Sequence, residues 1–478
     1  MIGQTLEDYI YKKYNNNKFW FEEEVKEQRT RISKIFDYRN YLDNIHKILN
    51  KQDFVYKDKE FKTKKLVFDE IKTILDFATI YLLGNNPSFT GTEDKVKIYN
   101  SLYRKGNYSL LDYKILDKVR KFGTLGEYIY PTHKGLTNKI KNVESRIIQP
   151  EDFYPIYTDT FNYVCAIEHW THKDSKVDYY RIYYKDKVEE WDNDGGLGLT
   201  LKQKYKSYGL PVLWKNFNDR DERFGKSVLD SLIPLIDALE NIISRLGDSI
   251  ETIITNPILH IDGELMNGGK GKESGQYSMN VDQIGYCIMT ESGGKISYPY
   301  AQMDYQCIKL YIDNIKEELY KIGAIPAVMY GQSNVANVSE TSIEQLYHVA
   351  TTQAKKNEKW FKQGLQQRWD IIDIILESYG IEFGIDEYID IQFNYCRPSN
   401  DTETIDNILK SRSIGMMSIK DCIEKNPLIS DVQQTLERLK EENEEGLNIS
   451  KNNENESRVN DNENMNNKSG NSESEDVV

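Results

Sequence analysis

Apolar residues recur with helical spacing in two segments of the middle third of the chain. In the first, from about residue 226 to 255, they are Leu232, Leu235, Leu239, Ile242, Leu246, Ile250 and Ile253. In the second, from about 302 to 322, they are Tyr305, Ile308, Ile312, Ile315, Leu319 and Ile322. Spacings of three and four residues place such side chains in a seam along one helix face. The sequence therefore predicts two helices whose seams pack on each other or on a neighbouring chain.

The segments that flank these helices carry other patterns. Residues 256–300, between the helices, are rich in glycine and contain short strand-like runs. The second helix is followed by Gly323-Ala324-Ile325-Pro326 and small polar residues, and then by a long helical pattern to about Tyr379. Thr341-Ser342-Ile343-Glu344 matches a capping box, which is predicted to open that helix. An alternating run at Tyr388–Tyr395 predicts a strand.

Helical patterns in the first quarter of the chain give way to β patterns. Residues 1–125 are mostly helical in pattern, including Leu66–Leu83, which a Gly-Asn-Asn-Pro sequence ends. The following residues form short runs rich in Tyr, Val and Ile, of which Tyr179–Tyr184 and Lys187–Trp191 read as a hairpin. The predicted fold class is therefore α+β, with an antiparallel β module at 126–215.

The charge of the chain is concentrated in its C-terminal tail. The formal net charge is −14, and residues 441–478, with 11 acidic and 3 basic side chains, contribute −8 of it. The other residues are close to balance, without the clustered Lys and Arg of a protein that grips duplex DNA. The tail has no aromatic residue and 11 Asn, so we expect it to be disordered.

Cysteine usage and hydropathy bound the class of protein further. None of the five cysteines forms a Cys-x-x-Cys pair, which predicts a reduced, intracellular protein without a zinc site or disulfide framework. The N-terminus lacks a signal-peptide pattern. The sequence contains no run of 18 apolar residues, so we expect no membrane span.

Three short motifs resemble chemical sites but lack what the chemistry requires. Gly268–Lys272 has the glycines and lysines of a phosphate loop, but Glu273 stands where Ser or Thr is needed and no helix pattern follows. Glu168, His169 and His172 have no evident third ligand on a shared face. Asp192–Gly196 lacks the distal Glu of a calcium loop. We therefore expect no enzyme activity, no metal and no cofactor.

The order of these elements, with several local phrases, resembles the portal proteins of tailed bacteriophages. One phrase is Ile147–Tyr157, with the sequence IIQPEDFYPIY, in the β module. A second is Phe224-Gly225-Lys226-Ser227, which leads into Asp237–Asn241 in the first helix. A third is Gly323–Pro326, before the long helix. The resemblance spans roughly residues 30–440 and rests on the order of loose motifs.

The resemblance implies a head-to-tail connector, a ring of commonly twelve copies at one capsid vertex. Such a ring passes double-stranded DNA, weakly bound and without sequence specificity, during packaging and ejection. Its implied partners are the terminase large subunit, the major capsid and scaffolding proteins, and the head–tail connector protein. The implied location is the virion, with assembly in the host cytoplasm and no membrane contact.

The portal architecture implies a division of the chain into named parts. These are an N-terminal arm (1–29), a wing (30–225), a first stem helix (226–255), a clip (256–300), a second stem helix (301–323), a tunnel loop (324–339), a long helix with a returning wing strand (340–399), a helical crown (400–440) and the acidic tail (441–478).

Three groups of site residues follow from this division. The DNA-tunnel loop comprises Gln332, Ser333, Asn334, Val335, Ala336 and Asn337, none of which is charged. The clip residues expected to dock the motor or connector are Lys270, Lys272, Glu273 and Ser274. The stem seam comprises Tyr305, Ile308, Ile312, Ile315 and Leu319. An uncharged loop suits a moving duplex because each phosphate contact would hold the DNA in place.

Two other classes of protein stay open at this point. Another phage head–tail structural protein, such as an adaptor, would share the setting but is usually much shorter. A phage DNA-processing enzyme would need a cluster of carboxylates for metal ions, and the carboxylates of this chain are scattered rather than grouped. DNA cleavage in the presence of magnesium would favour the enzyme.

Overall fold

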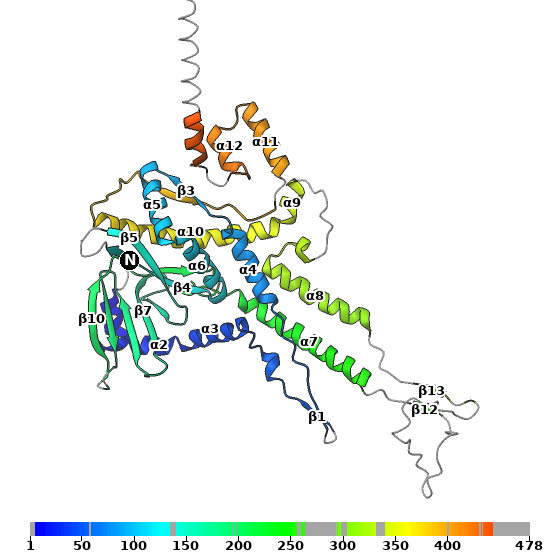
Figure 1. Ribbon diagram of the computed structural model, residues 1–478. Helices are drawn as coiled ribbons and strands as arrows, with labels where there is room; N and C mark the ends of the chain where they lie inside the picture. The colour runs from blue at the N-terminus through cyan, green and yellow to red at the C-terminus, as the bar shows by residue number, and fades with distance from the viewer. Residues whose placement is uncertain are drawn as a thin grey trace, which may run out of the picture. The chain divides into compact units, whose positions relative to one another are not determined.

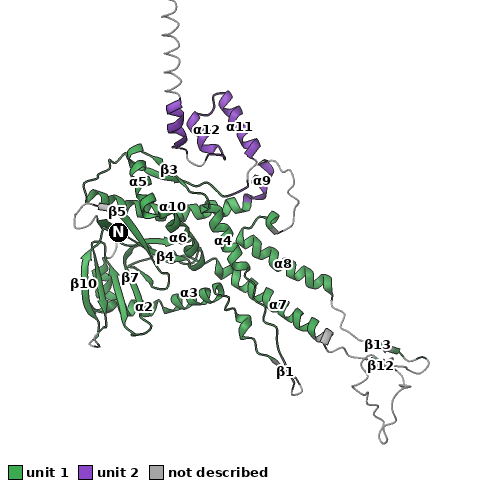
Figure 2. Cartoon of the chain, in the orientation of Figure 1, with its two compact units in different colours: residues 1–330, 349–396 green, residues 331–348, 397–478 purple. Residues whose placement is uncertain are grey.

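The computed structural model describes most of the chain, in two compact units (Figure 2). The first unit comprises residues 1–330 and 349–396, and the second comprises 331–348 and 397–478. The described residues are 5–56, 59–133, 140–194, 196, 198–255, 260–262, 293, 295–297, 304–330, 340–398, 401–429, 432 and 434–442.

Two antiparallel sheets form the β part of the first unit (Figure 1). The five-stranded sheet has the order β10-β9-β8-β7-β6, and the three-stranded sheet has the order β11-β4-β5. Their strands are β4 (Thr124–His133), β5 (Ile140–Ile148), β6 (Phe153–Tyr157), β7 (Tyr163–Thr171), β8 (Asp178–Tyr183), β9 (Lys187–Asp192), β10 (Thr200–Lys206) and β11 (Val212–Lys215). The predicted hairpin is confirmed as β8–β9, with Tyr183 opposite Val188.

Alternation along the strands gives the larger sheet two apolar faces. Cys165, Ile167 and Ile182 pack with Trp20 and Phe21 of the N-terminal helices, so these helices cover one face. Ala166 and Tyr183, on the other face, pack with residues of the smaller sheet such as Ile148. Because residues next to each other in a strand point to opposite faces, both layers follow from one alternating sequence.

Helices make up most of the rest of the first unit. They are α1 (Leu6–Tyr14), α2 (Trp20–Glu27), α3 (Arg29–Leu42), α4 (Glu70–Leu83), α5 (Glu93–Gly106), α6 (Tyr108–Phe122), α7 (Leu229–Thr255), α8 (Tyr305–Gly323) and α10 (His348–Glu377), with short 3-10 turns η1 (Lys47–Asn50) and η2 (Ala327–Tyr330). Three two-stranded pairs complete it: β1–β2 (Phe54–Tyr56 with Lys59–Phe61), β3–β14 (Ser88–Gly91 with Ile389–Gln392) and β12–β13 (His260–Asp262 with Lys295–Ser297). Helices and antiparallel sheets together confirm the expected mixed class.

A buried cation joins the helices to the smaller sheet. Arg368 of α10 donates from Nη1 to Asp112 Oδ1 at 2.6 Å, and its Nε lies 3.0 Å from Glu127 Oε1. Glu127, on β4, also accepts from Trp214 Nε1 at 2.8 Å. Burial raises the pKa of Asp112 to about 6, against the opposing charge of Arg368. The centre of the first unit therefore holds two carboxylates and one guanidinium.

The second unit is small and helical. Its helices are α9 (Glu340–Leu346), α11 (Asp401–Ser413) and α12 (Ile419–Lys425). Ser418 caps α12 in a capping box with Asp421. Met416 and Leu428 are exposed, whereas Ile423 is buried.

Several sequence expectations are wrong in detail. The predicted helix Leu66–Leu83 begins only at Glu70, because the backbone N–H groups of Leu66 and Phe68 donate to side chains of α7 rather than along a helix. Thr341–Glu344 lies inside α9, so it is not a capping box that opens the long helix, and α10 begins separately at His348. Strand β3, which pairs with the expected strand at 388–395, was not expected.

Candidate functional site: the paired helices α7 and α8

Helices α7 and α8 lie side by side with opposite chain directions, and together they extend away from the sheets (Figure 1). The helix predicted for 226–255 is present as α7, and the helix predicted for about 302–322 as α8. Asp304 caps α8 by accepting from the backbone N–H of Cys307 at 3.1 Å. We call the end of the pair near α4 the root and the opposite end the tip.

The apolar seam of α8 is buried at the root and exposed at the tip. Leu319 is 0% exposed and Ile315 is 9% exposed, whereas Tyr305 is 70% exposed. Ile308 and Ile312 are half-buried between them. Leu310 and Tyr311, outside the seam, are 62% and 50% exposed. Along α8, a single chain therefore covers the root half of this series of residues and leaves the tip half exposed.

Close packing against α4 holds the root. Leu319 of α8 belongs to one apolar cluster with Leu232 and Ile236 of α7 and with Ile74 of α4. A Cβ on Gly323 would lie 2.5 Å from Ile74 Cγ2, so glycine allows the two helices to approach. The next residue, Ala324, takes φ 55° and ends α8, with its backbone N–H bonded to the C-terminal carbonyls.

A backbone contact fixes the start of α7. A Cβ on Gly225 would lie 2.0 Å from Gly123 O and 2.6 Å from the backbone N of Asn216. Gly123 ends α6 with φ 85°, and its carbonyl accepts from Asn216 N at 3.0 Å. Ser227 then accepts from the backbone N–H of Leu229 at 3.0 Å, at the first turn of α7. The chain thus enters α7 through a junction that has no room for a side chain at 225.

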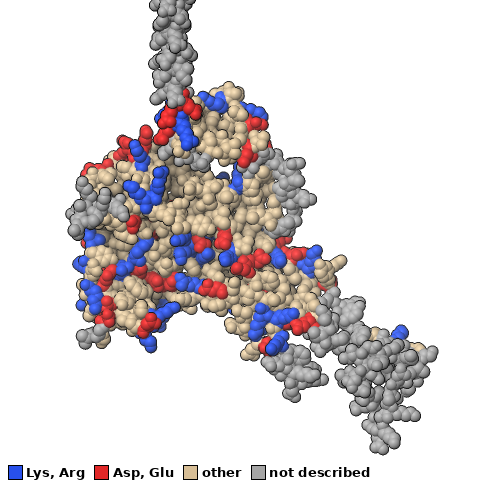
Figure 3. Space-filling model, in the orientation of Figure 1, with Lys and Arg blue, Asp and Glu red and all other residues tan. Residues whose placement is uncertain are grey.

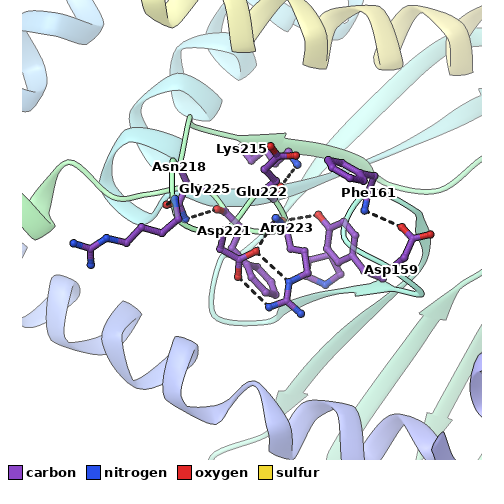
Figure 4. A network of polar contacts seen from close by, with 12 residues as sticks. Asp159, Phe161, Lys215, Asn218, Asp221, Glu222, Arg223 and Gly225 are labelled. Atoms are coloured by element: carbon purple, nitrogen blue, oxygen red, sulfur yellow. Dashed lines mark hydrogen bonds and ion pairs between the residues drawn. The ribbon is translucent and has the colours of Figure 1, made fainter.

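Polar contacts order the loop before this junction (Figure 4). Arg223 pairs with Asp221, and its carbonyl accepts from Tyr157 Oη at 2.6 Å. Asn218 Nδ2 donates to Phe224 O at 2.8 Å. The Tyr157 hydroxyl at the end of β6 is therefore bonded to the backbone of the loop that leads into α7.

Replacing Gly225 by Ala is expected to lower the free energy of unfolding by roughly 1–3 kcal/mol, the range for forced overpacking. The added methyl collides with backbone atoms that cannot rotate away. Chemical denaturation of both variants would measure this. Gly247→Ala is the matched control within α7: its Cβ meets only the flexible end of Lys64 at 3.0 Å, and alanine favours a helix by up to about 1 kcal/mol. Equal stability of the two variants would contradict the role given to the junction.

The charges on the visible surface are mixed in sign. Figure 3 shows Lys and Arg interspersed with Asp and Glu over the described parts of this face. Within the described ranges, no group of three His, Cys, Asp or Glu side chains is placed to hold a metal ion. Glu168 is instead paired with Arg146 and Arg181, which together with Tyr183 lower its pKa although burial raises it. Among the helices that the structure describes, none is long and apolar enough to cross a membrane.

Two of the three predicted site groups lie outside the described residues. These are the tunnel loop, Gln332–Asn337, and the clip residues Lys270, Lys272, Glu273 and Ser274. Of the tail, 441–478, only residues 441 and 442 are described.

Comparison with known proteins identifies the family. Residues 19–448 match the model of a family described as phage portal protein, SPP1 Gp6-like. The chain therefore belongs to the phage portal protein family, which makes it a structural protein rather than an enzyme. The portal protein of Bacillus phage SPP1 is 20% identical over 394 residues, which cover 78% of this chain and 74% of that protein.

Solved structures from gene transfer agent (GTA) particles are also similar. One is the neck of an empty GTA particle computed with C6 symmetry, at 10% identity and a TM-score of 0.44, covering 73% of this chain and 87% of that one. Another is the neck of a native GTA particle computed with C12 symmetry, at 11% identity and a TM-score of 0.39, covering 75% and 88%.

Proposed function

We propose that copies of this chain form a closed ring at one vertex of the capsid, through which double-stranded DNA is packaged and later ejected. Membership of the portal family supports this role. In the ring, α7 and α8 would be the stem, residues 256–300 the clip and 324–339 the tunnel loop. The clip would dock the terminase during packaging and the connector of the tail afterwards. Major capsid and scaffolding proteins would surround the wing and crown.

The exposed tip of the helix pair is the observation that carries the ring. Tyr305, Leu310 and Tyr311 are exposed to water in a single chain and add no stability there, because apolar side chains stabilise a structure only when they are buried. In a head-to-tail ring, the same surface of every copy meets a different surface of the next copy, and the rotation closes. The tip residues would then be covered by neighbouring stems.

Native mass spectrometry and negative-stain microscopy of the purified chain test the ring. We expect a large cyclic species with a central hole, formed either by the chain alone or with the capsid and scaffolding proteins. Burying a Leu-sized side chain is worth about 1.5–3 kcal/mol, so Leu310→Ser with Tyr311→Ser should raise the concentration needed for assembly about tenfold or more.

Leu201→Ser is the control, since Leu201 is an exposed apolar residue of β10, away from the helix pair. Monomers only, with all capsid components present, would contradict the ring. Rings that form equally well from the Leu310/Tyr311 variant would contradict the role of the tip.

A further inference from the structure

Helix α7 has a second, polar face that holds the N-terminal part of the chain. Five side chains lie along it at spacings of seven, three, four and four residues, which keeps them on one side of a helix. They are Asp230, Asp237, Glu240, Ser244 and Asp248. All five accept hydrogen bonds from residues 38–56 and 59–68, which we call the strap.

From Asp230 to Asp248, α7 is contacted first by residues 38–47 of the strap and then by residues 68, 66 and 64, in reverse sequence order. Tyr38 Oη donates to Asp230 at 2.6 Å, and Tyr41 Oη and Lys47 Nζ both donate to Asp237. Three backbone N–H groups make the other contacts: Phe68 to Glu240 at 2.9 Å, Leu66 to Ser244 at 3.1 Å and Lys64 to Asp248 at 2.7 Å. The strap contains the β1–β2 hairpin, which pairs with no other described strand. A lone two-stranded hairpin is marginally stable in water, so its position depends on this set of contacts.

His46 lies at the centre of the strap and is almost fully buried, at 2% exposed. Its Nδ1 is 2.5 Å from Glu240 Oε1, and its Nε2 is 2.9 Å from the carbonyl oxygen of Tyr41. Its ring also packs on the Tyr41 ring, with centroids 4.6 Å apart. The carbonyl can only accept, so Nε2 must carry a proton.

The second ring nitrogen needs a proton as well. A carboxylate can only accept, so the Nδ1···Oε1 contact is a hydrogen bond only if a proton lies on His46 or on Glu240. In either case the pair holds one proton more than a neutral imidazole beside a carboxylate. Without that proton, two lone pairs face each other inside a site from which water is excluded, and a buried polar group without a partner costs about 1–3 kcal/mol.

The surrounding charges favour the protonated state. Burial alone would lower the pKa of His46, but the hydrogen bonds to Glu240 and to Tyr41 O, with the charges of Glu240 and Asp237, raise that pKa above its ordinary value. Lys47, the next residue along the strap, is bound to Asp237 Oδ2 at 3.0 Å. Burial raises the pKa of the Tyr41 hydroxyl above its ordinary value, so Tyr41 is neutral where His46 titrates.

We propose that the proton shared by His46 and Glu240 is a clasp that fastens the strap to α7, and that losing it releases the strap. A group whose pKa is raised by folding stabilises the fold fully below its unfolded pKa, near 6.5 for His. This stabilisation is lost as the pH rises through the folded pKa. The strap should therefore be tight below about pH 6.5 and loosen as the pH rises above that value. This inference does not depend on ring formation.

Hydrogen exchange of the intact chain, measured by mass spectrometry between pH 5 and pH 10 and corrected for intrinsic rates, tests the clasp. Peptides from the strap should lose protection above pH 6.5, by about tenfold for each unit by which folding raises the pKa. Peptides from β7 and β8, in the five-stranded sheet, should not change over the same range. Strap peptides that change only in parallel with the sheet peptides would overturn the proposal.

Two variants locate the effect. Glu240→Gln keeps the size of the side chain but removes the negative charge that favours the extra proton, so the loss of strap protection between pH 6 and pH 10 should become much smaller than in the wild type. His133→Gln is the matched control, because His133 is exposed and bonded only to Tyr379 among the described residues. A wild-type pH profile in Glu240→Gln would overturn the proposal. If that variant does not fold, the wild-type profile decides, and equal strap protection at pH 6 and pH 10 refutes the clasp.

Discussion

Replacing Arg368 by Met is expected to lower the free energy of unfolding of the first unit by about 3–5 kcal/mol, the cost of breaking a buried ion pair by removing one partner. Arg368 is fully buried and contacts both Asp112 and Glu127. Its guanidinium also lies 5.0 Å from the Trp214 ring and 5.1 Å from the Tyr108 ring. Met fills much of the same volume, so the loss measures mainly the two carboxylates left without a cation.

The pH dependence of this loss separates charge from packing. Folding raises the pKa of Asp112 from 3.8 to about 6 even with Arg368 present, so the folded state takes up a proton more readily than the unfolded state. Stability from this group is therefore present at low pH and is lost as the pH rises from about 4 to 6. In the Arg368→Met variant the loss should be large at pH 8 and smaller at pH 5, because a protonated carboxyl is no longer a buried charge.

Urea denaturation at both pH values provides the measurement. Arg223→Met is the control, since Arg223 is an exposed residue paired with Asp221, and exposed pairs contribute at most about 1 kcal/mol. A loss that is the same at pH 5 and pH 8 would show that Arg368 acts through packing alone. Asp112→Asn with Glu127→Gln in the Met background should restore part of the stability.

The regular elements could be predicted because their signals are local. The seam of α8 and the alternation of β8 and β9 are each contained in a short stretch of sequence. The family could be recognised for a related reason. Two of the phrases that carry the resemblance contain Gly225 and Gly323, and at both positions the structure leaves no room for a Cβ. Such positions restrict the residue type whatever the rest of the sequence is.

The expectations that were wrong depend on contacts between distant residues. Leu66 matches the apolar spacing of the following helix, but its N–H is bound by Ser244, 178 residues away. Strand β3 has four residues, and its partner β14 lies some 300 residues later. Nothing near Arg368 distinguishes it from a surface charge on an amphipathic helix. The polar face of α7 did have a signal, since Asp237, Glu240 and Asp248 interrupt the apolar run on one side, but their partners are in the strap.

Replacing Ser333 and Asn334 by Lys is expected to leave ring and capsid assembly normal and to stop packaging before the genome is complete. This prediction rests on the proposed ring and on the placement of residues 332–337 at the DNA. The segment carries no charge in the sequence, and the two substitutions would add two cations per subunit around the bore. Each new phosphate contact releases counterions and so adds affinity for the duplex at every register. A duplex held in this way stalls.

The length of DNA recovered from purified heads, and the rate of packaging in vitro, measure this effect. Ser333→Thr with Asn334→Gly is the control, and it should package at nearly the normal rate because the loop stays neutral. Raising the salt concentration should relieve the stall of the double-Lys variant. Affinity that arises from counterion release decreases with salt, because log K falls linearly as the logarithm of the salt concentration rises. A defect that salt does not change would point to damaged folding instead. A full genome packaged at the normal rate would mean that these residues do not face the DNA, and the ring would then need another segment as the lining of its channel.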